Sequence, residues 1–161
     1  MSFVANPATL PSSAIDDVAG DGWYPALKVS AFKVAMRMGP SVSDARAREA
    51  LIGGLVSAAV GLSRWRTSQE AQGVTALEHS LVDGLPGPSI AGEKRAVILW
   101  RRAVHAFAAA DLVETHSDIS ATESGRDRRE VRAASADDLR RDATVALRDL
   151  MGRTRAKVAL V

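Results

Sequence analysis

The side chains that most often perform chemistry are few in this sequence of 161 residues. It has no cysteine and only three histidines, His79, His105 and His116. His105 and Asp111 are six residues apart in one predicted helix, a spacing that does not place two side chains on the same face. A metal site needs about three or four convergent ligands, and residues 84–87 lack the Lys-Ser/Thr of a phosphate-binding loop. The sequence therefore predicts no catalytic residue, no metal site and no cofactor, and favours a protein that is not an enzyme.

Arginine is the one charged residue type that clusters. Lysine and arginine number 21 against 19 acidic residues, a net charge of +2, so any basic surface must be local. Two clusters stand out, Arg101 with Arg102, and Arg126, Arg128 and Arg129 with Arg132. Each is either an ordinary solvated surface or a contact with an acidic partner or nucleic acid. Four phosphate contacts would give modest, salt-sensitive DNA affinity, which the interleaved Asp127 and Glu130 would oppose.

An aromatic pair, Trp23 and Tyr24, lies in an N-terminal arm, residues 1–29, that is otherwise rich in proline and glycine. Such a pair either packs onto its own domain or anchors the arm to a neighbouring subunit. We keep both alternatives and include the pair among the candidate interaction residues.

Four segments, residues 30–38, 43–72, 91–115 and 135–151, have the pattern of helices and must position these side chains. In the second, Ser43 is the expected N-cap and Gly73 the expected glycine after the helix end. Its apolar residues recur at spacings of three and four: Leu51, Leu55, Ala58, Leu62 and Trp65. Its three glycines weaken a helix, and we hypothesise that they allow close packing on another helix; they are Gly53, Gly54 and Gly61.

The third predicted helix is apolar on almost every side between residues 106 and 113. A helix of this kind is buried, either at the centre of its own bundle or beneath neighbouring subunits. The fourth helix begins at Ser135, which with Asp138 resembles a capping box. The polar residues 116–134 between them predict a long exposed loop.

The predicted fold class is all-α: a small bundle of about four helices with an irregular N-terminal arm and a short C-terminal β-strand tail. The boundaries are residues 1–29 for the arm, 30–152 for the helical domain and 153–161 for the tail. The tail ends in Val158-Ala159-Leu160-Val161, which suits a strand that pairs within the chain or adds to another subunit's sheet. The longest uncharged apolar stretch is too short to span a membrane, and no export signal is recognisable, so we expect synthesis in the cytoplasm.

Several short motifs in the second half resemble a known family when they are taken in order. Trp65, Gln69 and Gly73 are similar to the W-x-x-x-Q-x-x-x-G helix ending of phage head completion (GPL-type) proteins. Residues 101–104 resemble that family's R-R-A-V helix, and Asp118, Thr122 and Gly125 resemble its D-x-x-x-T-x-x-G loop. The C-terminal match comprises Arg141, Asp142, Ala143, Ala146, Arg148, Asp149, Gly152, Arg155, Val158 and Leu160.

This resemblance implies a virion structural protein at the neck of a tailed bacteriophage. Such a subunit docks under the portal ring after DNA packaging and provides the platform for the tail. The implied partners are the portal protein, a tail terminator or neck protein, and further copies in a ring matched to the portal's twelve-fold symmetry, with incidental contact to packaged DNA. The interaction residues expected are Trp23, Tyr24, Arg101, Arg102, Thr122, Arg126, Arg128, Arg129, Arg155, Val158 and Leu160. The alternative is a small helical DNA-binding packaging or regulatory protein.

Overall fold

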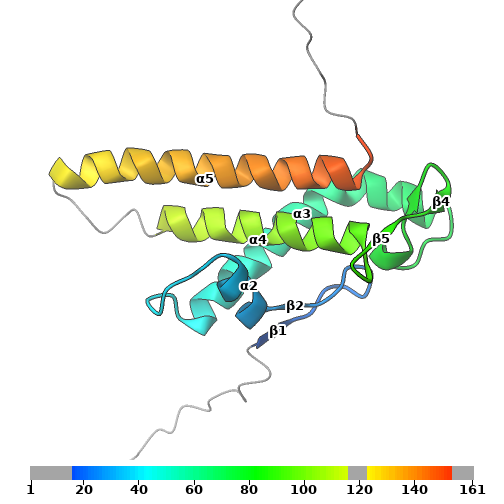
Figure 1. Ribbon diagram of the computed structural model, residues 1–161, viewed down its shortest axis with the longest axis horizontal. Helices are drawn as coiled ribbons and strands as arrows, with labels where there is room; N and C mark the ends of the chain where they lie inside the picture. The colour runs from blue at the N-terminus through cyan, green and yellow to red at the C-terminus, as the bar shows by residue number, and fades with distance from the viewer. Residues whose placement is uncertain (1–15, 116–122, 154–161) are drawn as a thin grey trace, which may run out of the picture.

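Three long helices form the body of the protein, and a short helix packs against two of them (Figure 1). The computed structural model describes residues 16–115 and 123–153, with the backbone alone for 123–134. The helices are α2 (Val29–Ala35), α3 (Asp44–Glu70), α4 (Arg95–Thr115) and α5 (Glu123–Leu150). In Figure 1, α4 and α5 run antiparallel side by side, and α3 crosses α4 obliquely on its other side. The predicted helical bundle is therefore confirmed in its main features.

Three short antiparallel strand pairs, which the sequence had not predicted, precede α2 or connect α3 to α4. In order, β1 (Asp17–Val18) pairs with β2 (Leu27–Lys28), β3 (Leu81–Val82) with β4 (Leu85–Pro86), and β5 (Ser89–Ile90) with β6 (Glu93–Lys94). A one-turn 3₁₀ helix, η1 (Leu77–His79), precedes β3. The arm predicted as irregular thus contains β1 and β2, while the predicted C-terminal strand lies outside the described residues.

The ends of α3 follow from its sequence. The Ser43 hydroxyl accepts a hydrogen bond from the Arg46 amide, and Asp44 lies in the first turn, as predicted. After the helix, Gly73 has φ of 84° and its amide donates to Glu70, while the Val74 amide donates to Gln69. This pair of hydrogen bonds is the Schellman motif, which requires a residue that tolerates positive φ.

The buried face of α3 includes a glycine at a helix crossing. Leu51, Ala58 and Leu62 of the predicted stripe are fully buried, and Gly54 lies on the same face. A Cβ added at Gly54 would lie 2.5 Å from the Val104 carbonyl oxygen of α4. The close packing that we hypothesised is therefore confirmed at Gly54.

The central helix is α4, which resolves the alternative left by its apolar second half. It packs within one subunit, mainly against α3 and α5. Its buried residues are Trp100, Ala103, Val104, His105, Ala106, Ala108, Ala109, Ala110 and Leu112. The predicted start at residue 91 was wrong. Ala91 and Gly92 have φ of 51° and 80° and form the turn between β5 and β6, so the helix begins at Arg95.

The predicted loop over residues 116–134 was also wrong for its larger part. Helix α5 begins at Glu123, so Ser135 is inside the helix and is not its N-cap. Residues 126–134 are mostly arginine, glutamate and alanine, which have high helix propensity, and these outweigh the cost of isolated Ser and Gly residues. The end of α5 at Gly152, where φ is 70°, agrees with the prediction. In the described part of the chain, no helix is long and apolar enough to cross a membrane.

Candidate protein-interaction surfaces

The aromatic pair of the N-terminal arm is buried in its own subunit. Trp23 and Tyr24 are only 5% and 4% exposed. The Tyr24 ring stacks on Trp100 of α4 with centroids 4.0 Å apart, and Trp23 meets Trp65 of α3 edge to face at 5.9 Å. Of the two alternatives, packing on the same domain is confirmed. The pair is not available as an exposed anchor, because burial of large aromatic surface holds it against α3 and α4.

Arg66 of α3 completes this aromatic cluster. Its guanidinium lies 5.0 Å from the Trp23 ring centroid and 5.3 Å from that of Tyr24, and it forms ion pairs with Asp21 and Glu70. Asp21 also accepts hydrogen bonds from the amides of Trp23 and Tyr24, and these contacts and Arg66 lower its pKa against an opposing effect of burial. Only the Arg66–Glu70 spacing of four residues was visible in the sequence. The residues after β1 are thus fixed to α3 by cation–π and ionic contacts.

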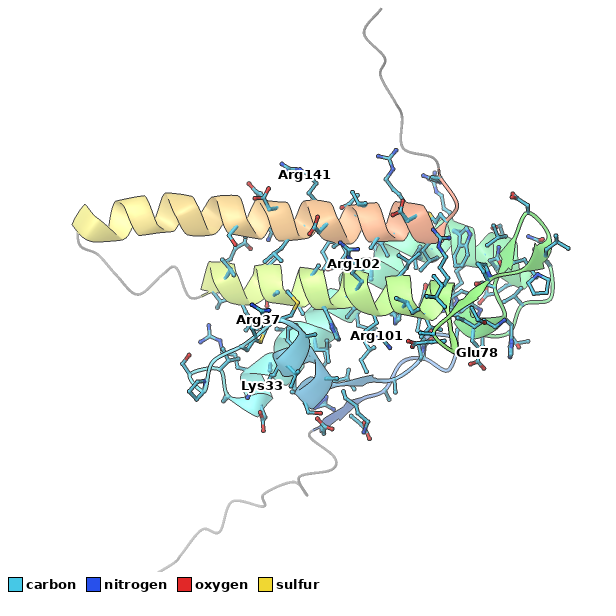
Figure 2. All side chains as sticks on the ribbon, viewed as in Figure 1. Lys33, Arg37, Glu78, Arg101, Arg102 and Arg141 are labelled. Atoms are coloured by element: carbon cyan, nitrogen blue, oxygen red, sulfur yellow. The ribbon has the colours of Figure 1, made fainter. Side chains whose placement is uncertain are left out.

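Arg101 and Arg102, neighbours on α4, have different surroundings. Arg101 forms two hydrogen bonds with the Glu93 carboxylate, of 2.6 and 2.8 Å, which lower the pKa of Glu93. Arg102 is exposed and has no ion pair among the described residues. Figure 2 shows Arg101 on the side of α4 toward α2, and Arg102 on the side toward α5. Of the two, Arg102 is the one free to meet an acidic group of a partner.

Both arginines border a groove of about 390 Å³ that we call the α2–α4–α5 groove. Its lining is mostly apolar, with charged groups from Arg101, Arg102 and Asp142. The lining residues are Ala31, Ala35, Met36, Ile98, Arg101, Arg102, His105, Ala106, Leu139 and Asp142. An open apolar groove with a few polar groups is typical of a site that receives apolar side chains.

His105 lies in the wall of this groove and is 6% exposed. Its ring is 5.2 Å from Phe32, and its Nε2 atom has no hydrogen-bond partner within the described residues. Burial, assisted by the positive charge of Arg101, lowers the pKa of His105 to about 4. The imidazole is therefore neutral at pH 7, and its unpaired Nε2 is costly in a buried position.

The other predicted interaction residues are described by their backbone alone or lie outside the described part of the chain. Arg126, Arg128 and Arg129 lie on the backbone of α5, in the part described without side chains. The rest lie outside the described residues: Thr122, Arg155, Val158 and Leu160.

Of the three arginines of α5 whose side chains are described, two are ion-paired. Arg140 pairs with Glu114 of α4, and Arg141 pairs with Asp138 at 2.7 Å. These ion pairs offset the positive charge that a DNA-binding helix would present to phosphates. Across residues 16–115 and 123–153, no group of three or more His, Asp or Glu residues could hold a metal ion.

These surfaces define a class of protein. The described body is a helical scaffold whose prominent features are an apolar groove and exposed apolar side chains, which are features of protein-binding subunits.

Comparison with known proteins gives the family. The chain belongs to the phage head completion protein (GPL) family, whose model matches residues 18–161. It is also similar to the head completion/stabilization protein of Escherichia phage P2, with 27% identity over 154 residues, covering 94% of this chain and 88% of that protein. No solved structure matches the chain significantly. The chain is therefore a phage head completion protein and a component of the virion.

Proposed function

We propose that this protein is the head–tail connector subunit that docks beneath the portal ring after DNA packaging and presents the platform for tail attachment. Its partners are then the portal protein, a tail terminator or neck protein, and further copies of itself in a ring matched to the portal, with twelve-fold symmetry expected. Contact with packaged DNA is incidental. The observation that carries the proposal is the family match over residues 18–161.

The distribution of exposed apolar side chains supports an assembly role. Val56 and Val60 of α3 are 55% and 68% exposed, while Leu85 and Ile90 of the hairpins are 69% and 54% exposed. A closed ring of identical subunits needs two different surfaces on each subunit, joined head to tail. The α3 residues and the hairpin residues, which lie on separate elements, are candidates for those two surfaces.

Deletion of residues 153–161 tests the connector role. The deletion begins after Gly152 ends α5, so the helical circular dichroism signal should remain at the wild-type level. We expect a phage that carries this variant to accumulate DNA-filled heads without tails, visible by electron microscopy. Complementation with the full chain should restore joined particles.

Two outcomes would contradict the proposal. One is a normal yield of infectious particles from the truncated protein. The other is absence of the full-length protein from the neck in cryo-electron microscopy of intact virions. A gel-shift assay at moderate salt separates the DNA-binding alternative, for which a retarded duplex band would be required.

A further inference from the structure

The α2–α4–α5 groove is an open, mostly apolar surface of the described body. Its apolar lining comes from three helices: Ala31 and Ala35 of α2, Ile98 and Ala106 of α4, and Leu139 of α5. Leaving this apolar surface in water costs free energy in proportion to its area. An occupant with apolar side chains would remove that cost.

His105 contributes a largely buried ring to the lining of the groove. Its Nε2 atom has no partner within the described residues, but it is itself buried and out of reach of an occupant. This atom therefore sets no polar requirement, and the groove selects an occupant chiefly by apolar side chains.

The chain enters the described structure next to this groove. The Asp16 carboxylate accepts hydrogen bonds from the Ser30 amide at 2.8 Å and the Ser30 hydroxyl at 3.1 Å. Ser30 precedes Ala31, the first groove residue of α2. An extended chain spans about 3.3 Å per residue, so four residues cover roughly the diameter of a helix. Residues 1–15 are more than long enough to reach the groove.

The composition of residues 1–15 fits the groove. The segment has no charged side chain and carries five larger apolar residues together with neutral hydrogen-bonding groups. The apolar residues are Met1, Phe3, Val4, Leu10 and Ile15, and the polar ones are Ser2, Asn6, Thr9, Ser12 and Ser13. Pro7 and Pro11 restrict the free segment, which lowers the entropy lost on binding.

The C-terminal residues 154–161 fit less well. They carry Arg155 and Lys157, whereas residues 1–15 carry no charged side chain. Moving a charged side chain from water into a mostly apolar groove costs free energy. The apolar lining therefore favours the N-terminal segment.

From these observations we propose that residues 1–15 bind in the α2–α4–α5 groove of their own subunit, with their apolar side chains against its apolar lining. Covalent attachment at Asp16 makes the binding intramolecular, with an effective concentration in the millimolar range for a short linker. The family match begins at residue 18, so it does not account for this segment.

Disulfide trapping in the full chain tests the proposal, because the protein has no native cysteine. The test variant carries Ala8→Cys with Ala35→Cys, which is an exposed position in the groove. The control carries Ala8→Cys with Val60→Cys, which is 68% exposed on α3 and does not line the groove. We expect intramolecular disulfide formation at least ten-fold faster in the test variant, measured by gel mobility and by mass spectrometry of linked peptides.

A second measurement does not depend on cysteine substitution. In the full chain, Phe3→Ser with Leu10→Ser should shift the NMR signals of the His105 ring and the Ala35 amide, and leave the Val60 amide unchanged. Equal cross-linking rates in the two cysteine variants would overturn the proposal. So would cross-linking that occurs mainly between subunits, since the groove would then receive the arm of a second copy.

Discussion

Alanine substitutions at the glycines of α3 should give opposite changes in stability. Gly53 and Gly54 are adjacent, but a Cβ at Gly53 would meet nothing within 4 Å, whereas one at Gly54 would lie 2.5 Å from the Val104 oxygen and 2.9 Å from the Ala108 nitrogen. Both substitutions gain about 1 kcal/mol of helix propensity. Only Gly54→Ala must also push apart the backbones of two helices, since neither contact is a flexible side chain.

The cost of that overpacking is about 1–3 kcal/mol, and the upper end applies because backbone atoms must move. Gly54→Ala should therefore lower the free energy of unfolding by about 2 kcal/mol, and Gly53→Ala should raise it by about 1 kcal/mol. For a domain of this size, each kcal/mol corresponds to roughly 2–4 °C in Tm. The expected changes are thus a fall of about 4–8 °C and a rise of about 2–4 °C.

Urea and thermal denaturation followed by circular dichroism at 222 nm would measure both variants. Gly61→Ala is an internal standard, because its Cβ would meet only the Cδ1 atom of Leu147 at 2.8 Å, which can move. For this variant, the gain in helix propensity and the cost of displacing the Leu147 side chain should nearly cancel, so the free energy of unfolding should stay close to the wild-type value. If Gly54→Ala were as stable as Gly53→Ala, the close crossing of α3 and α4 would be refuted.

Three further predictions concern titration and the extent of α5. Tyr24 is the only tyrosine, and burial raises its pKa to about 12 against an opposing effect of Arg66, so absorbance at 295 nm should titrate well above the usual value near 10. The native state then holds this proton longer than the unfolded state, and stability should fall from pH 10 upward; a titration midpoint near 10 in the folded protein would contradict this. Burial lowers the pKa of His105 to about 4 in the native state, so the unfolded state takes up a proton first as the pH falls. The stability that neutral His105 contributes is therefore complete above about pH 6.5 and is lost as the pH falls toward 4. In urea melts, His105→Leu should weaken this dependence of stability on pH, and an unchanged dependence would be the contrary result. Ser135→Pro should cost about 3 kcal/mol or more if α5 is continuous from Glu123, whereas a helix starting at Ser135 would tolerate proline there.

Local signals in the sequence predicted the parts of the fold that local interactions determine. The cap at Ser43, the positive φ at Gly73 and the buried half of α4 all depend on residues within a few positions of each other, and each was confirmed. The β5–β6 hairpin was missed for a physical reason. Its turn places Ala91 at φ of 51°, a conformation that alanine rarely adopts, so no sequence signal marked it.

The interaction surfaces depend on contacts between residues far apart in the chain, which spacing cannot show. Trp23 and Tyr24 were apparent as an aromatic pair, but their burial rests on Trp65 and Trp100, more than forty residues away. Likewise, the α2–α4–α5 groove takes residues from three helices, and only Arg101 and Arg102 were singled out beforehand. The predictions at Thr122 and in the tail remain predictions.

The internal contacts of the described body indicate where its binding capacity lies. The charged groups of Arg66, Arg101 and Arg140 are paired with Asp21, Glu93 and Glu114 of the same subunit, so they are not free to specify a partner. What remains is apolar surface on α3, on the hairpins and in the groove, with Arg102 unpaired within the described residues. Apolar surface of this kind contributes affinity, and an exposed charge beside it, such as that of Arg102, can fix the orientation of a partner. A scaffold that pairs these charges internally and leaves apolar patches exposed is suited to the connector role that we propose, in which those patches would be covered by neighbouring subunits.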